Sequence, residues 1–331
     1  MFLKKFKGTG PGVIIMIFFI ALILWISAFI NPPTYSDSTF ETNPMPLYSL
    51  LKAVAGVTPF IGVLFSFCMV LLMAFLLVSF NTSEFFISER TFQPAIIYIL
   101  ISGLFPQLQI LNPVLPAALF LMLTIRRIMD AYRVQGTAFN FFDAGILLST
   151  GSFFYADLIW FGLLIIIGIA LLRTGNVREL SISLLGLATP WIITFGLYYV
   201  LGKDIGLFLA LVGDNLFNAS AGIIIPRITI VALIFLIVLI LVSIVHLLTF
   251  INSKKIKSRK TFFLLIWEFF ISIVLLVILP SVSAEILWLT GIAASYFITH
   301  YFVFARKKVV PEIFFTGLII LIFLIQILYI F

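Results

Sequence analysis

Two carboxylates in the longest hydrophilic stretch of the sequence have a spacing that could support chemistry. Asp37 and Glu41 lie four residues apart within residues 31–49, so a helical conformation would place them on one face. Carboxylates that face the same way repel each other unless a divalent cation such as Mg²⁺ or Mn²⁺, or a proton, lies between them. Such a pair could hold a metal ion or act as a general base toward a hydroxyl group. The alternative is a solvated loop that happens to contain two acids.

Three basic residues are candidates for binding an anionic group. Lys52, Lys203 and Arg227 fall on the outer side of the membrane when the chain is placed in a bilayer as described below. Cations are under-represented on the translocated side, so these three are candidates to hold a phosphate or a lipid head group. Snorkelling of long side chains to the membrane interface is the competing interpretation.

Two acidic residues interrupt apolar segments, where a charge is costly. Asp157 lies at the junction before residues 158–172. It is expected either to cap that helix or to line an outer cavity, and these two roles are compatible. Glu268 lies near the start of another apolar segment, and pairing with Lys260 or Arg259 is the favoured interpretation.

The metal-binding and nucleophilic residue types are sparse. His246 and His300 are the only histidines, and neither has a ligand partner three or four positions away. We expect each to be a helix-end or packed polar residue, and we predict no histidine-rich metal site. Cys68 is the single cysteine, which excludes a disulfide within one chain and predicts a small core residue. No phosphate-binding loop, nucleophile elbow or zinc-protease motif is present.

The composition indicates what kind of fold must position these residues. Hydrophobic residues make up 63% of the 331 and charged residues only 10%, whereas soluble domains average about 25% charged residues. Lipid must therefore surround most of the apolar surface. The net charge of +7 comes from short basic clusters between apolar runs. That distribution is typical of membrane topology, so we predict no nucleic-acid partner.

The apolar runs predict an all-α, polytopic transmembrane bundle with about eleven spans. Two pairs are short and resemble tightly turned or re-entrant hairpins, whose ends need surrounding protein. The first run is too long for a signal-peptide core, so we expect it to be retained. The expected spans are residues 12–31, 57–80, 94–105, 109–125, 144–156, 158–172, 180–201, 223–251, 262–280, 286–304 and 313–331.

The basic residues predict the orientation. With the N-terminus in the cytoplasm, Lys52, Lys203 and Arg227 are the only ones of the 20 basic residues to fall outside. We therefore predict a bacterial cytoplasmic (inner) membrane protein with an outer loop over residues 31–56. Within that loop, residues 47–56 could form a short amphipathic helix in the interface. Residues 202–222 are predicted to be a second outer loop.

The order of these features resembles the membrane region of GT-C-type glycosyltransferases, which use sugars linked to polyprenyl phosphate. The resemblance covers about residues 12–203. It begins with an acidic outer loop followed by NPMPLYSLLKAV (43–54) and continues through a short helical pair within residues 85–128. The last matching pattern is SLLGLATPWIITFGLYYVLGK (183–203). The whole chain also looks like an uncharacterised family of bacterial inner-membrane proteins.

The resemblance implies sugar transfer on the outer membrane face, with a GT-C-like core at residues 1–203 and further transmembrane helices at residues 204–331. Asp37 would be the first candidate for general base or metal ligand and Glu41 the second. Lys52, Asp157, Lys203 and Arg227 would contribute to substrate or phosphate binding. The implied partners are membrane lipids and a polyprenyl-phosphate sugar.

The sequence also departs from the family. Asn112 stands where the family often has an acidic residue, and the large C-terminal outer domain of the family is missing. Two other functions therefore remain open. One is a non-catalytic subunit or scaffold with a membrane protein partner in an envelope-assembly complex, and the other is a small-molecule or lipid transporter.

Overall fold

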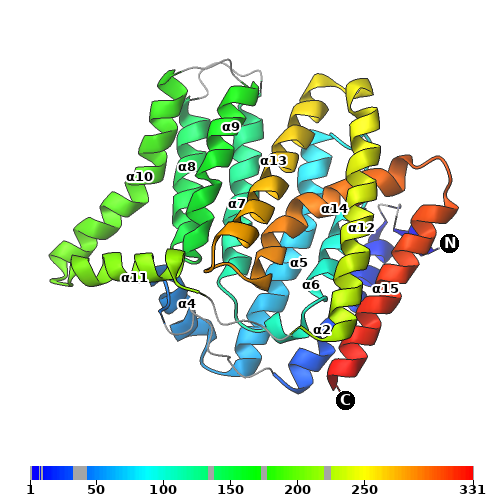
Figure 1. Ribbon diagram of the computed structural model, residues 1–331, viewed down its shortest axis with the longest axis horizontal. Helices are drawn as coiled ribbons and strands as arrows, with labels where there is room; N and C mark the ends of the chain where they lie inside the picture. Colours follow the sequence, from blue (N-terminus) through cyan, green and yellow to red (C-terminus); the bar gives the residue numbers. More distant parts are fainter. Residues whose placement is uncertain are drawn as a thin grey trace.

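The protein is helical throughout the part of the chain that the structure describes. The computed structural model describes residues 2–6, 8, 10–32, 43–132, 138–172, 177–219 and 225–330. Within these ranges the chain forms α-helices, short 3₁₀ helices and turns, and it forms no β-strand (Figure 1). The predicted all-α class is therefore confirmed.

Seven helices are long and apolar enough to cross a membrane. The length follows from the rise of about 1.5 Å per residue, since about 20 residues are needed to span the hydrocarbon core. These helices are α2 (Pro11–Ile30), α5 (Pro59–Glu84), α10 (Val177–Val200), α12 (Arg227–Phe250), α13 (Ile256–Ile278), α14 (Leu287–Phe304) and α15 (Val309–Ile330).

Four shorter helices correspond to the two predicted hairpins. Helices α6 (Gln93–Ser102) and α7 (Val114–Asp130) are joined through the 3₁₀ helix η1 (Pro106–Leu108). Helices α8 (Ala138–Ser152) and α9 (Gly162–Leu172) are joined through η2 (Ala156–Phe161). Each of the eleven predicted apolar segments thus lies on an α-helix, with boundaries that differ by a few residues.

The segments predicted to be outer contain two further helices, α4 (Pro46–Ala55) and α11 (Ile205–Phe217), and a short α1 (Phe2–Lys5) precedes α2. The predicted helix over residues 47–56 is α4. Within the predicted second loop, residues 202–222, residues 205–217 form α11, a helix that the sequence analysis did not anticipate. The carboxylate of Asp204 caps this helix by accepting the backbone N–H groups of Gly206, at 2.7 Å, and Leu207, at 3.4 Å.

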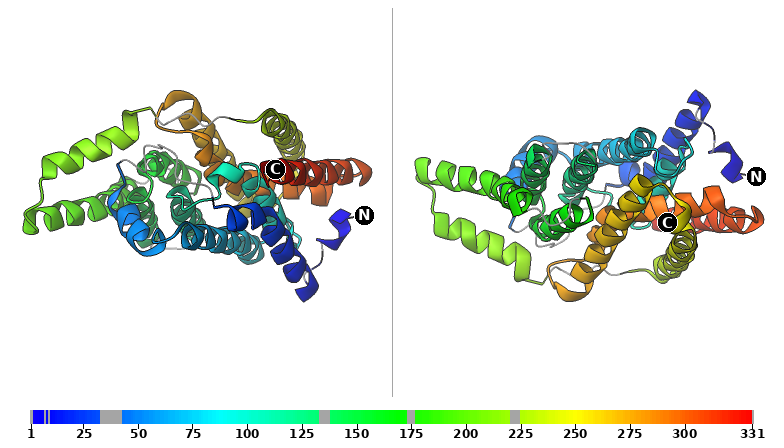
Figure 2. Two further views of the ribbon diagram at one scale, coloured as in Figure 1. Left: turned by 90° about the horizontal axis from the view of Figure 1, so that it is seen from below. Right: turned by 90° about the horizontal axis from the view of Figure 1, so that it is seen from above.

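Helices α6 and α14 form the centre of the bundle (Figures 1 and 2). Every residue of α6 is buried, and so is every residue of α14 from residue 288 to residue 303. The hydroxyl of Tyr98 on α6 donates to the carbonyl of Trp288 at 3.2 Å. The hydroxyl of Tyr296 on α14 donates to the carbonyl of Leu77 on α5 at 2.8 Å. A helix that is apolar on all sides is expected in such a central position.

Helices α8 and α10 pack closely through two glycines. A Cβ added at Gly186 would lie 2.3 Å from the carbonyl oxygen of Phe142, and one at Gly145 would lie 2.6 Å from that of Ser183. Small residues allow such close backbone approach in membrane bundles. Pro190 lies inside α10, and beyond it the helix turns away from α8 to form, with α11, an arm at one end of the molecule (Figure 1).

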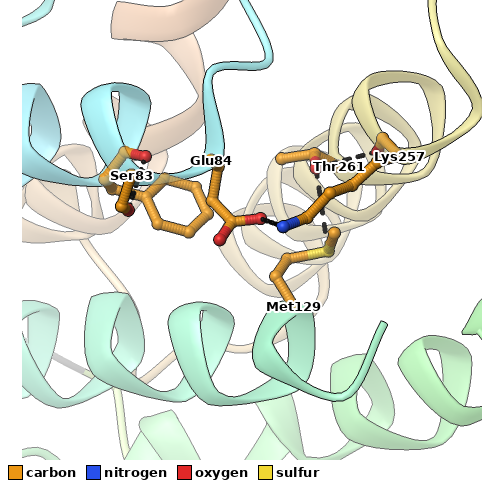
Figure 3. A network of polar contacts seen from close by, with 6 residues as sticks. Ser83, Glu84, Met129, Lys257 and Thr261 are labelled. Atoms are coloured by element: carbon orange, nitrogen blue, oxygen red, sulfur yellow. Dashed lines mark hydrogen bonds and ion pairs between the residues drawn. The ribbon is translucent and has the colours of Figure 1, made fainter. Parts of the chain in front are cut away.

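One end of the bundle is rich in basic residues. The turns between α5 and α6 and between α12 and α13 both lie at the top of Figure 1. There the ammonium of Lys257 on α13 pairs with the carboxylate of Glu84 on α5 at 2.8 Å (Figure 3). Beside this pair, the hydroxyl of Thr261 lies 3.8 Å from the sulfur of Met129 on α7. These contacts tie three helices together at this end.

Candidate functional site

Two buried carboxylates share a polar pocket at the other end of the bundle, near the end of α13. Asp157 lies in η2, and Glu285 lies in η4 (Ala284–Ile286), the 3₁₀ helix before α14. Each is only 2% exposed. The pocket is small, with a cavity volume of about 10 Å³, room for about one water molecule, and Tyr155, Asn215 and Ser281 also line it. Three separate segments thus bring polar side chains to one place.

Hydrogen bonds fix both carboxylates. The hydroxyl of Ser281 lies 3.1 Å from Oδ1 of Asp157, and the hydroxyl of Ser283 donates to Oε2 of Glu285. Burial between α8 and α9 raises the pKa of Asp157 to about 7, the Glu285 carboxylate adds to the rise, and the Ser281 hydroxyl opposes it. A carboxyl group with a pKa near neutrality is a stronger base than an ordinary one.

Asp157 lines a cavity and does not cap α9. The residue before η2 is Tyr155, and α9 itself begins at Gly162. The carboxylate of Asp157 contacts Ser281, which lies beyond the end of α13. Of the two roles expected for Asp157, the structure therefore supports a side chain that lines a cavity. The predicted helix cap was wrong.

An apolar groove lies along α12, α13 and α14, and we call it the α12–α14 groove. It has a cavity volume of about 270 Å³, and its lining includes Leu236 of α12, Phe269 of α13 and Gly291 of α14. Ala284 and Ile286, the two neighbours of Glu285, line the groove as well. Glu285 itself lines the polar pocket, so the groove and the pocket meet the same short helix on different sides.

The acidic pair Asp37 and Glu41 lies outside the described residues, so the predicted metal or base site there stays a prediction. The segment that follows is described, and it reaches the pocket. Nδ2 of Asn215 donates to the carbonyl of Asn43 at 2.8 Å. Asn43 follows Glu41 by two residues in the sequence, and its carbonyl contacts a residue that lines the polar pocket.

The three predicted cations lie on separate elements. Lys52 is half-buried in the last turn of α4. Lys203 is exposed at the corner between α10 and α11, with Nζ 5.5 Å from the centre of the Tyr198 ring. Arg227 is exposed as the first residue of α12. That corner and the start of α12 lie well apart in Figures 1 and 2, so the structure does not gather the three cations. Arg227 comes two residues after Ile225, which lines the α12–α14 groove.

Glu268 does not pair with Lys260 or Arg259. It is fully buried on α13, where Ser272 of the next turn donates to Oε1 at 3.4 Å. Nζ of Lys260 lies instead over the ring of Tyr132, 5.7 Å from its centre. The expected ion pair fails because α13 points Glu268 toward the centre of the bundle, away from its basic first turn.

The two histidines meet in space, which their sequence positions do not indicate. The rings of His246 on α12 and His300 on α14 have centres 5.6 Å apart. His300 is fully buried, and neither of its ring nitrogens has a hydrogen-bond partner in the described part of the chain. Among the described residues, no three or more histidine, cysteine or acidic side chains gather in a way that could hold a metal ion.

Sequence reasoning missed Glu285, Ser281 and Asn215. Glu285 had a usable signal, since it is an acidic residue at the start of an apolar segment on the predicted outer side. Ser281 and Asn215 had none, because polar residues at such boundaries are common and only tertiary packing brings them to Asp157.

Together these features define a multi-helical protein with apolar helices suited to a membrane, a pair of carboxylates buried in a small polar pocket, and a separate apolar groove. The chain belongs to a family of unknown function, DUF6427, whose model matches residues 48–331. No curated protein and no solved structure matches it.

Proposed function

We propose that this protein transfers a sugar from a polyprenyl-phosphate carrier on the outer face of the bacterial cytoplasmic membrane. The observation that carries the proposal is that Ala284 and Ile286 line the α12–α14 groove while Glu285, the residue between them, lines the polar pocket together with Asp157. A lipid-linked donor needs an apolar channel for its tail and acidic or basic groups at the channel's end for its head group. The resemblance of residues 12–203 to GT-C-type glycosyltransferases points in the same direction.

The proposal includes the topology. The helices α2, α5–α10 and α12–α15 would make eleven crossings from a cytoplasmic N-terminus, with residues 1–203 arranged as in GT-C enzymes. The turn between α12 and α13 lies at the top of Figure 1, next to the Lys257–Glu84 pair, and it carries a dense cluster of basic residues. This cluster supports a cytoplasmic face at that end. The polar pocket would then face the outer side.

Labelling tests this orientation directly. The chain has one cysteine, so a Cys68→Ser background accepts single cysteines at residues 37 and 255. A membrane-impermeant thiol reagent added to intact cells should label residue 37 and not residue 255. Labelling of residue 255 alone would place the acidic loop in the cytosol and remove the proposal.

In the proposed reaction, the acceptor hydroxyl attacks the anomeric carbon of the donor sugar. A new bond forms between the acceptor oxygen and that carbon while the bond from carbon to phosphate oxygen breaks. The hydroxyl proton passes to a carboxylate, and the phosphate leaves with the bonding electron pair. Asp157 is the first described candidate for the proton acceptor, because burial has already raised its pKa to about 7.

The remaining predicted residues take supporting roles in this proposal. Asp37 and Glu41 lie in the segment that ends at Asn43, so they are candidates for a second base or for a Mg²⁺ or Mn²⁺ ligand. Arg227 is best placed to neutralise the donor phosphate, since it begins the helix that lines the groove. Lys52 and Lys203 are candidates for contacts with the acceptor or with lipid head groups.

The test measures the donor and the product in cells. Membrane lipids from a deletion strain carrying Asp157→Asn or Glu285→Gln should accumulate polyprenyl-phosphate sugar, measured by mass spectrometry, while envelope glycans lose that sugar. Asp204→Asn is the matched control, because asparagine also caps a helix well. Normal amounts of donor and glycan in both site variants, at normal protein levels, would remove the proposal.

One observation favours the second function, a non-catalytic subunit with a membrane protein partner. The arm formed by the end of α10 and by α11 exposes large apolar side chains, including Leu197 at 55% and Leu207 at 71%. A partner helix could pack against this face. Purification in mild detergent would distinguish the two functions. A protein that co-purifies in stoichiometric amount with the wild type, and that is lost from the Leu197→Ser variant, would favour the subunit function.

A further inference from the structure

The pocket that Asp157 and Glu285 share holds acidic groups without a basic one. Both carboxylates are buried, and no basic side chain of the described residues lines the pocket. Removing a charged group from water is costly unless an opposite charge or a proton compensates it. Two carboxylates buried in one small pocket therefore need either protons or a cation.

The hydroxyl of Tyr155 is a second, independent sign of a ligand. Tyr155 is only 6% exposed and lines the same pocket. Its hydroxyl lies beside Asp157 without making a hydrogen bond of ordinary geometry to any described residue. Buried polar groups in folded proteins are nearly always hydrogen-bonded, so this oxygen lacks a partner that a bound ion would supply.

Asn215 also has an oxygen atom to spare. Its Nδ2 atom donates to the carbonyl of Asn43 at 2.8 Å and to that of Leu211 at 2.9 Å. An amide nitrogen carries two protons, so both are used, and Oδ1 is the polar atom that remains. Ser281 adds a hydroxyl oxygen to the lining. The pocket is thus surrounded by oxygen ligands from separate segments of the chain.

We propose that this pocket binds one calcium ion. The ligands are oxygen atoms of the five polar side chains that line the pocket, which are Tyr155, Asp157, Asn215, Ser281 and Glu285. Calcium takes about six to eight oxygen ligands in flexible geometry, and carboxylates can bind it through one oxygen or both. Two carboxylates, two hydroxyls and an amide can supply that number.

The size and the charge of the pocket favour Ca²⁺ over other common cations. The cavity of about 10 Å³ has room for about one water molecule, so the ion must shed its hydration shell. Mg²⁺ gives up its waters reluctantly and demands octahedral geometry, whereas Ca²⁺ accepts flexible coordination by protein oxygens. A divalent ion also neutralises both carboxylates, which a single Na⁺ or K⁺ ion does not.

The ion joins three segments that are far apart in the sequence. Asp157 lies in η2, Glu285 in η4 and Asn215 near the end of α11. Because the unfolded chain has no such site, binding of the ion stabilises the folded protein. Without the ion, protons are the other means of neutralising the pair. Calcium and the proton of the proposed reaction compete for Asp157, but the site binds its ion whether or not a sugar is transferred.

Thermal unfolding of the purified protein in detergent tests the site. The protein is first treated with a chelator, and Ca²⁺ or Mg²⁺ is then added at about 1 mM, a concentration that fills extracellular calcium sites. We expect Ca²⁺ to raise the melting temperature by several degrees and Mg²⁺ to leave it nearly unchanged. Equilibrium dialysis of the wild-type protein with radioactive calcium should give one ion per chain.

Variants assign the effect to the pocket. Asp157→Asn and Glu285→Gln should each lose most of the calcium-dependent rise, whereas Asp204→Asn, at the exposed cap of α11, should keep it. Tyr155→Phe removes a hydroxyl without a protein partner, so it should not lower the melting temperature in chelator. The same variant should reduce the calcium-dependent rise, which a purely structural hydroxyl would not do.

Three results would overturn the inference. One is the absence of a calcium-dependent rise in the wild type, and another is an equal rise with Mg²⁺. The third is a rise of wild-type size in both Asp157→Asn and Glu285→Gln. None of these results measures sugar transfer, so the proposed function is tested separately by the lipid and glycan analysis.

Discussion

The hydroxyl of Ser281 lies 3.1 Å from Oδ1 of Asp157 and 3.0 Å from the backbone carbonyl of Leu216. A serine hydroxyl has one proton, so it can donate to only one of these two acceptors at a time. When Ser281 donates to Asp157, the hydrogen bond stabilises the charged carboxylate and opposes the rise in pKa that burial causes. When Ser281 donates to Leu216 instead, the Asp157 carboxylate loses that stabilisation.

The first prediction concerns the dependence of stability on pH. The pKa of Asp157 is about 7 in the folded protein, against an ordinary value of 3.8. The unfolded chain loses this proton at a lower pH than the folded protein does. The free energy of unfolding therefore falls as the pH rises from 3.8 to about 7. Asp157→Asn removes the titrating group, so its melting temperature in detergent should fall less than that of the wild type between about pH 5 and about pH 8.

The control for this prediction is Asp204→Asn. Asp204 is exposed and caps α11, so its replacement leaves the buried group in place. This variant should follow the wild-type pH profile. Parallel profiles for Asp157→Asn and the wild type would show that Asp157 titrates normally in the folded protein.

The second prediction concerns the close packing of α8 and α10. A Cβ at Gly186 would lie 2.3 Å from the backbone oxygen of Phe142, so Gly186→Ala forces the two helices apart. Gly196 lies on the same helix and has nothing within 4 Å of such a Cβ. We expect Gly186→Ala to lower the melting temperature by several degrees and Gly196→Ala to leave it unchanged or slightly raised. Equal melting temperatures for the two variants would contradict the predicted separation of the helices.

The helices could be predicted because the bilayer imposes a length and a composition on each of them. Long apolar runs such as residues 227–250 have no other stable conformation in lipid. Helix α11 was missed for the opposite reason. Its ends carry Asp204, Asp214 and Asn215, which are typical of a loop when no neighbouring element is known.

The candidate site could be predicted only in part. Asp157 was found because a charge inside an apolar segment is costly and therefore informative. Its partner Ser281 lies 124 residues further along the chain, and no periodic pattern connects the two. Glu268 was assigned to the wrong partner because the rotation of α13 depends on its packing against α14, which hydropathy does not encode.

The third prediction concerns His300, whose two ring nitrogens lack hydrogen-bond partners in the described residues. A buried polar group without a partner costs about 1–3 kcal/mol, so His300→Phe should raise the melting temperature. The surrounding rings of Phe262 and Phe304, at 5.3 and 4.8 Å between ring centres, would pack against the new side chain.

Tyr296→Phe, on the same helix, provides the contrast for His300→Phe. It removes the hydroxyl that donates to Leu77 at 2.8 Å, so it should lower stability by about 1 kcal/mol. A clear loss of stability in His300→Phe would instead indicate that the imidazole binds an ion or a water molecule.

The fourth prediction concerns the Lys257–Glu84 pair shown in Figure 3. The side chain of Glu84 is only 7% exposed, and Lys257 lies 2.8 Å away. Lys257→Met leaves this carboxylate buried without its counter-ion, which should cost about 1–3 kcal/mol. Lys255→Met removes an exposed charge from the same turn and should change stability by less than about 0.5 kcal/mol.

Adding Glu84→Gln to Lys257→Met should restore part of the loss, because the amide is cheaper to bury than a lone charge. If Lys257→Met and Lys255→Met unfolded at the same temperature, the ion pair would contribute nothing to joining α5 and α13.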